Sequence, residues 1–452
     1  TRVGHGGHRR WRVDRVTWTG APDGGKGRMP MSGPHRGARI VAIAVMVALL
    51  VWAWTPALAR DHRIGPEGDW AGVAQALASG RISGGDRLVL APGEHGALRI
   101  DGAHFDPPLT IAAQGAGAHV DRIAIKNSSG LVIRGLRVWP RSPLGREINL
   151  VETSTDSPRI RLEALDIRGG PDALDYLTWT RQDWTDTWAA RGARLRGADN
   201  TLRDSTLTAV TNGIITEGLR AKVIGNEVRG FSKDGLRGLS SDSLFQRNTV
   251  RDCVDVSGNH DDGFQAWVAK PGRFGPSALR NVTLDGNRIL EWTGPADHPL
   301  RCRLQGIVLF SGPFENWTII NNLVVVSAHH GITLYSGINS RVINNTVISS
   351  TGAARNAPWI RQQATKRGAP RNTVFANNVA TAFRLGDTVS NPLARNTVSL
   401  FPFRDFEDPA TFDFRPHADS RLLGMADPDL VPPHDLTGTP RPAAAALGAL
   451  ER

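Results

Sequence analysis

The chain of 452 residues carries 54 Lys and Arg against 43 Asp and Glu, a formal net charge of +11, and only two cysteines. The first 59 residues hold nine of the basic and two of the acidic residues, so the rest is close to balance, at 45 against 41. A near-neutral folded part without a nucleic-acid motif argues against nucleic acid as a partner. The absence of C-x-x-C or His/Cys clusters argues against zinc.

The N-terminal residues have the pattern of an export signal. Residues 40–54 are an unbroken apolar run, preceded by two Arg residues and followed by Ala57-Leu58-Ala59. This order is typical of a secretory signal peptide, and the run is short for a membrane span. We expect residues 1–59 to be a basic leader and signal peptide, although a retained signal anchor is an open alternative. The chain from Arg60 on is then secreted or periplasmic, without stable membrane insertion, and we expect a monomer.

The next segment, residues 67–96, predicts a cap for one end of the fold. Its apolar residues recur at i, i+3, i+4 and i+7, as on one face of a helix. These residues are Trp70, Val73, Ala74 and Leu77. Asp69 is the expected N-cap. Such a helix covers strand edges that would otherwise be exposed.

Two short motifs repeat through residues 212–335. The first is a polar residue, Gly and a large apolar residue: Asn212-Gly213-Ile214, Asp234-Gly235-Leu236, Asp262-Gly263-Phe264, Gln305-Gly306-Ile307 and His330-Gly331-Ile332. The second is Asn, any residue, then Val or Ile: Asn226-Glu227-Val228, Asn248-Thr249-Val250, Asn287-Arg288-Ile289, Asn322-Leu323-Val324 and Asn345-Thr346-Val347. Without an insertion the step is about 22 residues, which predicts a solenoid of stacked repeats.

The local pattern selects the kind of solenoid. The apolar runs are short, β-rich and punctuated by Gly and Asn, and none is long enough for a helical repeat. The Asn of the second motif fits a corner where it bonds to the equivalent Asn one coil away. We therefore predict an all-β fold, a single right-handed parallel β-helix with coils of about 22 residues, a capping helix and loop insertions. Residues 60–385 form the β-helix, and residues 386–452 form a closing segment packed on it.

Motifs at both ends carry a family resemblance. Residues 85–96 read GDRLVLAPGEHG, residues 413–415 read DFR, and residues 435–442 read DLTGTPRP. Together they resemble the opening and closing motifs of secreted bacterial right-handed parallel β-helix proteins of the pectate-lyase-like superfamily. The resemblance implies a polysaccharide lyase or glycoside hydrolase type of protein. It indicates the fold more closely than the activity, because this fold hosts lyases, hydrolases, epimerases and inert modules.

The polar residues of the first motif predict a site. We expect the residues before each Gly to face outward, because Gly often marks a bend in a strand. Neighbouring coils lie about 4.8 Å apart, so Asp234, Arg237, Asp262 and Gln265 should lie together. Stacked carboxylates raise one another's pKa, which is common at functional sites. The candidate catalytic residues are Lys233, Asp234, Arg237, His260, Asp261, Asp262 and His330.

Loop insertions supply candidate substrate contacts. Residues 176–188 contain three Trp and one Tyr. Their rings are either platforms for sugars or a lid packed on the coils. A later insertion, residues 294–304, adds two Arg residues. The candidate substrate-binding residues are Trp179, Trp184, Trp188, Gln265, Trp267, Arg301, Arg303 and His329.

Two enzyme hypotheses follow. The first is a lyase that cleaves a uronate polysaccharide by β-elimination, which needs a base, a cation for the uronate carboxylate and an acid. Lys233 or His260 is the candidate base, and Arg237 is the carboxylate partner or acid. The candidate ligands for Ca²⁺ are the carboxylates of Asp234, Asp261 and Asp262. This is similar to chondroitinase and alginate-lyase-like β-helix families, which place a Lys and an Arg about one coil apart, whereas here both lie in one coil.

The second hypothesis is an inverting glycoside hydrolase, because the Asp-Gly, Asp-Asp and His-Gly motifs are similar to those of polygalacturonase-like enzymes. A uronate C5-epimerase and a non-catalytic polysaccharide-binding β-helix are further alternatives. All four share a polysaccharide partner. The two cysteines, Cys253 and Cys302, form either a disulfide or two buried thiols.

Overall fold

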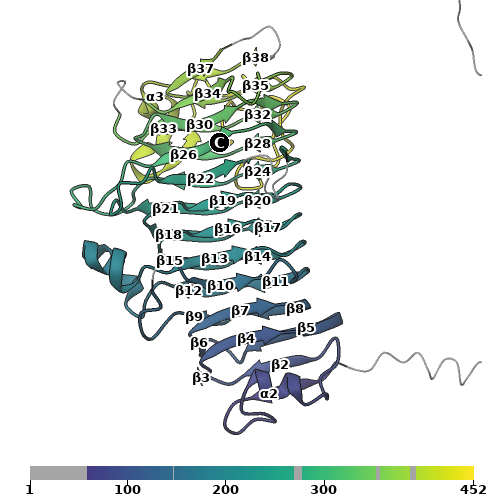
Figure 1. The fold of residues 1–452 in the computed structure, drawn as a ribbon. Coiled ribbons are helices and arrows are strands. Elements are labelled where there is room, and N and C mark those ends of the chain that lie inside the picture. The colour runs from purple at the N-terminus through teal and green to yellow at the C-terminus, as the bar shows by residue number, and fades with distance from the viewer. Residues whose placement is uncertain (1–58, 146, 269–276, 353–356, 387–392) are drawn as a thin grey trace, which may run out of the picture. The chain divides into compact units, whose positions relative to one another are not determined.

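Three long parallel sheets, joined coil by coil, build the folded part of the chain (Figure 1). The computed structural model describes residues 59–145, 147–268, 277–352, 357–386 and 393–452. All but the last residue of the expected leader and signal peptide lies outside this part. Within it, no helix is long and apolar enough to cross a membrane.

The strands of each sheet follow one another along the stack. The thirteen-stranded sheet contains β1 (Asp61–Ile64), β2 (Arg87–Leu90), β5 (His104–Ala113), β8 (Ser129–Arg134), β11 (Ile160–Glu163), β14 (Thr201–Arg203), β17 (Lys222–Ile224), β20 (Leu244–Gln246), β24 (Thr283–Asp285), β28 (Thr318–Ile320), β32 (Arg341–Ile343), β35 (Val374–Ala376) and β38 (Leu393–Ala394). The eleven-stranded sheet contains β4 (Ala97–Asp101), β7 (Arg122–Lys126), β10 (Asn149–Thr153), β13 (Arg191–Leu195), β16 (Ile214–Thr216), β19 (Leu236–Gly238), β22 (Asp262–Trp267), β26 (Gln305–Ser311), β30 (His330–Tyr335), β34 (Trp359–Gln363) and β37 (Ala382–Leu385). The twelve-stranded sheet contains β3 (Gly93–Glu94), β6 (Ala118–Val120), β9 (Arg137–Val138), β12 (Asp166–Arg168), β15 (Thr206–Val210), β18 (Glu227–Phe231), β21 (Thr249–Cys253), β25 (Arg288–Leu290), β29 (Leu323–Val326), β33 (Thr346–Ser349), β36 (Val379–Ala380) and β39 (Thr397–Val398). A small parallel sheet pairs β23 (Leu279–Arg280), β27 (Phe314–Glu315) and β31 (Gly337–Ile338).

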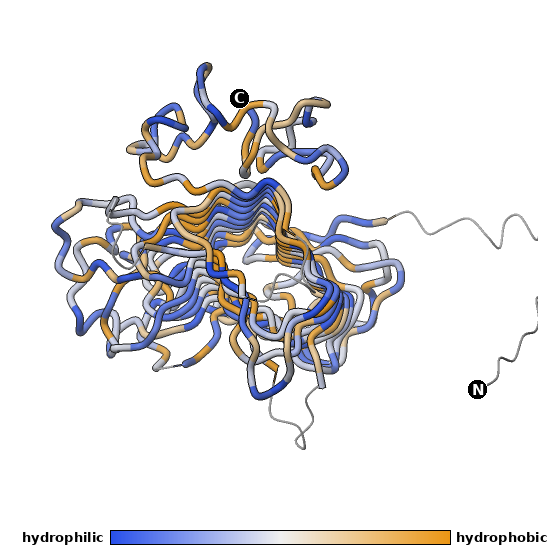
Figure 2. Tube along the Cα trace, turned by 90° about the horizontal axis from the view of Figure 1, so that it is seen from above, coloured by the Kyte–Doolittle hydropathy of each residue, from blue (hydrophilic) through white to orange (hydrophobic). Residues whose placement is uncertain are grey.

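Most coils contribute one strand to each long sheet. The coil of β16, β17 and β18 is followed by that of β19, β20 and β21, and every pair between them is parallel. Ile214 lies opposite Leu236, a step of the predicted 22 residues. Both side chains are buried in one core that runs through the stack. The coils superpose when viewed along the stack (Figure 2). The prediction of a parallel β-helix is confirmed.

The predicted corner ladder of asparagines is present. Each amide Nδ2–H donates to the Oδ1 of the next Asn at 2.8 to 3.0 Å. The ladder is Asn226, Asn248, Asn287, Asn322, Asn345, Asn378 and Asn396. The left-handed backbone of the corner lies at the residue before the ladder Asn, for example at Arg247 (φ 51°) and Asn321 (φ 57°). The ladder Asn itself therefore satisfies buried backbone groups instead of making the sharp turn.

The N-terminal end carries the expected helix in a shorter form. The helix α2 spans Val73–Ala78, and its N-cap is Gly72. Asp69 instead accepts a hydrogen bond from the backbone N–H of Arg63 at 2.8 Å. The prediction of Asp69 as the N-cap was wrong, because the helix begins one turn later and this carboxylate caps a strand end.

The closing segment covers the last coils of the twelve-stranded sheet. It contains α3 (Pro402–Asp405), β40 (Phe406–Asp408), the short 3₁₀ helix η3 (Pro409–Thr411) and β41 (Asp413–Pro416). Phe406 and Phe414 pack in one buried cluster with Leu323 and Val325 of β29. Figure 2 shows this segment, which ends at the C-terminus, alongside the stack.

An aromatic insertion covers the twelve-stranded sheet nearer the N-terminus. It forms the 3₁₀ helix η1 (Ala173–Thr178) and the π-helix η2 (Asp183–Thr187). Tyr176 and Trp184 pack there with Ala209 of β15. The Tyr176 hydroxyl donates to Asp252 at 2.6 Å. The insertion is thus fixed to the wall of the stack.

Candidate functional site

The Gly of the first motif turns its polar neighbour outward. A Cβ on Gly235 would lie 2.3 Å from a side-chain methyl of Val250, and one on Gly263 would lie 2.3 Å from a methyl of Ile289. Val250 and Ile289 belong to the core. The Gly and the apolar residue after it therefore both face the core, so the residue before the Gly lies on the outer face. Only Gly fits so close to the core wall.

Two adjacent columns of side chains result on the outer face of the eleven-stranded sheet. We name them the polar column and the second column. By register the polar column is Asn149, Arg191, Asn212, Asp234, Asp262, Gln305 and His330. The second column is Arg237, Gln265, Val308, Thr333, Arg361 and Arg384.

The two columns are joined by repeated contacts between residues i and i+3. The Nε–H of Arg237 donates to Asp234, and the Nε2–H of Gln265 donates to Asp262. The other oxygen of Asp234 accepts the backbone N–H of Asp262 at 3.2 Å. The predicted cluster of these four residues is therefore present, and each carboxyl group fixes one donor of the second column.

The two carboxyl groups are more enclosed than the sequence suggested. Asp234 is 1% exposed and Asp262 is 0% exposed, whereas the side chain of Arg237 is 21% exposed. Gln265 is half-buried and His260 is exposed. A substrate on this face thus meets Arg237, Gln265 and His260 first, and the Asp side chains act from behind them.

Burial shifts the protonation of all three carboxyl groups. Loss of hydration raises the pKa of Asp234 despite the opposing charge of Arg237. Burial, followed by the charge of Asp234, raises the pKa of Asp262 well above its usual value. Burial also raises the pKa of Asp261 to about 8. The cluster therefore holds neutral carboxylic acid near neutral pH, which can donate a hydrogen bond or a proton.

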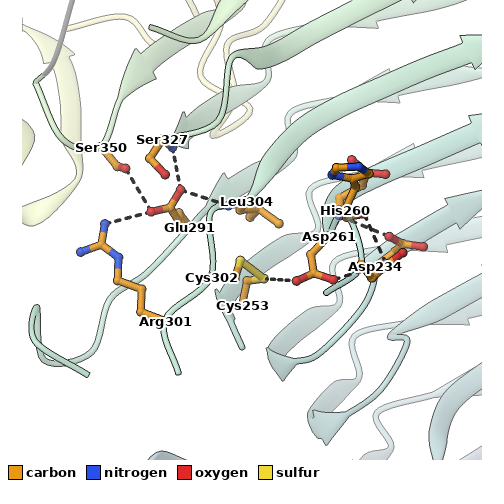
Figure 3. Close-up of a disulfide and its surroundings, with 12 residues drawn as sticks. Asp234, Cys253, His260, Asp261, Glu291, Arg301, Cys302, Leu304, Ser327 and Ser350 are labelled. Carbon is orange, nitrogen blue, oxygen red and sulfur yellow. Dashed lines mark hydrogen bonds and ion pairs between the residues drawn. A yellow bond between two sulfur atoms is a disulfide. The ribbon is translucent and has the colours of Figure 1, made fainter. Parts of the chain in front are cut away.

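Asp261 lies between the disulfide and the carboxyl cluster (Figure 3). Cys253 and Cys302 form the disulfide, which decides between the two alternatives left open by the sequence. The Sγ of Cys253 is 3.5 Å from Oδ2 of Asp261. A disulfide sulfur carries no proton, so a hydrogen bond here requires the carboxyl group to donate it. This geometry fits the raised pKa of Asp261.

Buried polar atoms without partners gather in the polar column. Within the described residues, eleven buried side-chain N or O atoms have no hydrogen-bond partner. Six belong to this column: Asn149 Oδ1, Arg191 Nε, Asn212 Oδ1 and Nδ2, Asp262 Oδ1 and Gln305 Oε1. Such atoms are rare in folded proteins and are normally satisfied by water or a ligand. The column is therefore equipped to bind a polar molecule.

A pocket borders the column beside Lys233. Its volume is about 300 Å³, and Glu147, Trp184, Thr211 and Lys233 line it. The Nζ of Lys233 is 3.6 Å from Oε1 of Glu147. Lys233 therefore faces this pocket, on the side of the polar column that carries the aromatic insertion.

The aromatic insertion does not present all its rings to solvent. Trp179 is 5% exposed and Trp184 is 1% exposed, and their rings pack 5.1 Å apart. Trp188 is half-buried and lies against Gly170. For the first two rings, the arrangement fits the packed-lid interpretation and provides no free face for a sugar. No signal in the sequence separates a packed Trp from an exposed one.

Of the remaining predicted substrate contacts, Trp267 and His329 lie beside other site residues and Arg303 is exposed, whereas Arg301 is bonded within its own loop. Trp267 lies near Arg237, whose Cζ is 5.4 Å from the ring centre. His329 packs on His330 with ring centres 4.1 Å apart, and Arg303 is exposed. Arg301 instead pairs with the buried Glu291 at 2.9 Å. Arg301 thus stabilises its own loop, on the far side of the disulfide from Asp261 (Figure 3).

Three rings that the sequence did not predict surround His330 and extend the face, those of Phe310, Tyr335 and Trp359. Phe310 lies 4.9 Å from His330 and 5.4 Å from Tyr335, and His330 lies 5.4 Å from Trp359. All four residues are half-buried. We name this set the aromatic floor. Burial lowers the pKa of His330 to about 4, so its ring is neutral at neutral pH and suited to packing against a sugar.

The three carboxyl groups do not form a ready calcium site. Among the described residues, Asp261 lies within 4.8 Å of two other possible ligands, but these are the disulfide-bonded Cys253 and Cys302, and no such group joins the three Asp residues. Arg237, Gln265 and Asn259 already bond to Asp234, Asp262 and Asp261 respectively. Raised pKa values also oppose the ionised form that Ca²⁺ requires. Calcium at these residues stays a prediction, and no step below uses it.

No family model and no curated protein matches the chain. Among solved structures, pectate lyase Pel9A is 14% identical over 87% of this chain and 96% of its own, with a TM-score of 0.49. The AlgE6 A-module, a mannuronan C-5 epimerase of Azotobacter vinelandii, is 12% identical over 72% and 91%, with a TM-score of 0.43. The polysaccharide lyase Pedsa3628 of Pseudopedobacter saltans is 13% identical over 72% and 91%, with a TM-score of 0.43. These similarities concern the fold alone.

Proposed function

We propose that this chain is an exported carbohydrate-active enzyme that cleaves a uronate-containing polysaccharide by β-elimination. The observation that carries the proposal is the polar column. Six unpartnered buried polar atoms, the carboxyl groups of Asp234 and Asp262 with their raised pKa, and the partly exposed Arg237 share one face of one sheet, and Asp261 with its raised pKa lies next to Asp262 in the chain. A merely solvated surface does not need buried polar atoms, since water satisfies exposed ones.

In this proposal Arg237 binds the carboxylate of the uronate. Asp234 holds the guanidinium in place, so its donors are already oriented when substrate arrives. Neutralising the carboxylate makes the neighbouring C5 proton more acidic. Gln265, fixed by Asp262, contributes hydrogen bonds to the sugar beside it.

The base takes the C5 proton, the C4=C5 double bond forms, and the bond from C4 to the leaving oxygen breaks. His260 and Lys233 are the two candidates for the base. His260 is exposed beside Asp261 (Figure 3), and Lys233 faces the neighbouring pocket. The leaving oxygen takes up a proton, and the neutral carboxyl group of Asp261 is a local source of one.

The raised carboxyl pKa values also favour a second candidate, an inverting glycoside hydrolase. Such an enzyme needs one carboxylic acid that stays protonated and one carboxylate that activates water. Asp262 has the first property. We rank this candidate second, because all three carboxyl groups have a raised pKa and Asp234, the one that pairs with a cation, is already bonded to Arg237.

The test is a screen of the chain from Arg60 on against polygalacturonate, alginate, hyaluronan and neutral polysaccharides. Each reaction is followed by the ultraviolet absorbance of unsaturated uronate and by new reducing ends. Both signals together are expected for the lyase. Reducing ends without absorbance support the hydrolase. Silence in both readouts across the panel contradicts a cleaving enzyme for these substrates.

A further inference from the structure

The second column continues past the aromatic floor to two arginines. Arg361 of β34 and Arg384 of β37 lie directly opposite each other in neighbouring strands. The Cζ of Arg361 is 5.1 Å, and that of Arg384 is 4.8 Å, from the centre of the Trp359 ring. Both cations thus gather around one indole, four and five coils beyond Arg237 in the same column.

The two cations differ from other arginines of the stack in their pairing. Arg122, Arg194 and Arg251 each pair with a Glu of a neighbouring coil, whereas within the described residues neither Arg361 nor Arg384 forms an ion pair with an Asp or Glu. Like charges directly opposite in adjacent strands repel each other. Together with Arg303 they also lower the pKa of His329, after the larger effect of its burial. The described residues at this end of the face therefore carry positive charge that no described carboxylate balances.

A cavity and an unpartnered donor accompany the two cations. A pocket of about 670 Å³ is lined by Arg361, Gln363, Phe383 and Arg384. The Nε1–H of Trp359 is buried and has no acceptor among the described residues. Two guanidinium groups that line one pocket match an anionic group with several acceptor oxygens.

We propose that Arg361, Arg384 and Trp359 form a subsite for an acidic group of the polysaccharide, several sugar units away from the unit at Arg237. The acidic group is a carboxylate or a sulfate ester, which present the same anionic oxygens. The inference rests on the proposed function in assuming that one polymer chain crosses both places. Four coil steps of about 4.8 Å separate Arg237 from Arg361, on the order of 19 Å. Only an oligosaccharide several units long reaches both.

Because only a long oligosaccharide reaches both Arg237 and Arg361, the subsite is tested by comparing the binding of short and long oligosaccharides. The double variant Arg361→Gln/Arg384→Gln is compared with wild type in calorimetric binding of oligogalacturonate and oligoguluronate, each as dimer and as octamer. Chondroitin sulfate and its desulfated form separate sulfate from carboxylate recognition. Arg99→Gln is the matched control, because Arg99 is an exposed arginine on β4 of the same sheet. The melting temperature of each variant checks the fold.

The double variant is expected to bind at least one acidic octamer about tenfold or more weakly, a typical loss for hydrogen bonds to charged groups. Dimer binding and the Arg99→Gln variant should match wild type. Equal binding of every octamer by wild type and double variant overturns the subsite, and so does the absence of binding to all acidic chains. Arginine-dependent binding without cleavage keeps the subsite and rejects the lyase. Cleavage with an unchanged KM and affinity in the double variant keeps the lyase and rejects the subsite.

Discussion

Asp234 accepts a hydrogen bond from Arg237 three residues later, and 0% of the Asp234 side chain is exposed. The carboxyl group is thus a buried anchor for a guanidinium that reaches the surface. We predict that Asp234→Asn lowers kcat/KM about a hundredfold with little change in folding, because the weaker partner leaves Arg237 poorly oriented. Steady-state kinetics on the cleaved substrate give the answer. Asp199→Asn, which breaks the exposed pair with Arg220, is the control, and an equal effect of both variants contradicts the role.

The effect of Asp262→Asn on kcat distinguishes elimination from hydrolysis. In the lyase account its neutral carboxyl group holds Gln265, a task that an amide of the same shape largely preserves. Asp262→Asn is then expected to reduce kcat by no more than about tenfold. As the acid of a hydrolase, Asp262 would have to supply a proton, and its loss would cost about 10² to 10⁴ in rate. A measured drop of this larger size argues against the lyase account.

Asp261 makes stability depend on pH. Its pKa is raised from 3.8 to about 8, so the folded state binds more protons than the unfolded state between these values. Stability from this group is fully present below pH 3.8 and is lost as the pH rises to about 8, at about 1.4 kcal/mol per pH unit. Asp234 and Asp262 act in the same direction.

His330 acts in the opposite direction at lower pH. Its pKa is lowered from 6.5 to about 4, so stability is lost as the pH falls through this window. His330 and the three carboxyl groups therefore change the free energy of unfolding in opposite directions below pH 6.5. Above pH 6.5, of these four groups, only the carboxyl groups change it. We predict that Asp261→Asn flattens the decline in the free energy of unfolding between pH 6.5 and about 8. Urea unfolding at several pH values measures this decline. A decline as steep in the variant as in wild type would disprove the raised pKa of Asp261.

The disulfide ties the insertion that contains Cys302 to the end of β21 beside Asp261. Its two cysteines are 49 residues apart, and a closed loop of this length typically stabilises by about 2 to 4 kcal/mol. Cys302→Ser is expected to lower the free energy of unfolding by this amount. Reductant should have the same effect on wild type and none on the variant. A variant as stable as the oxidised wild type would exclude a structural role.

Calcium gives a separate prediction. The carboxyl oxygens already bond to Arg237, Gln265 and Asn259, so chelation with EDTA is expected to leave both rate and melting temperature unchanged. Addition of Ca²⁺ after chelation is the control. A rate that falls on chelation and returns with Ca²⁺ would restore the three Asp residues as metal ligands.

The repeat made most of the fold predictable. The Asn of the second motif predicted a corner ladder, since an amide can donate to its copy one coil away, and Asn322 does so to Asn345. The Gly of the first motif likewise predicted the outward turn of Asp234 and Asp262. In both cases a local stereochemical need recurs at a fixed period, so the sequence alone reveals it.

Other features depend on contacts between segments that lie far apart in sequence. The enclosure of Asp262 and the packing of Trp184 arise from neighbours that no spacing rule identifies. Arg361 and Arg384 extend the second column, but the Gly motif stops at Gly331, and the period is interrupted before β34. Arg191 was also missed, because Arg191-Gly192-Ala193 carries the motif with a small residue in its last place.

The measurement that tests the central claim most directly is the fate of solvent oxygen during cleavage. Wild type and Arg237→Ala are incubated with the polysaccharide found in the screen in ¹⁸O-labelled water, and the products are analysed by mass spectrometry. Elimination predicts unsaturated products without ¹⁸O from wild type, and little product from Arg237→Ala. Saturated products that carry ¹⁸O, or full activity of Arg237→Ala, would contradict the account.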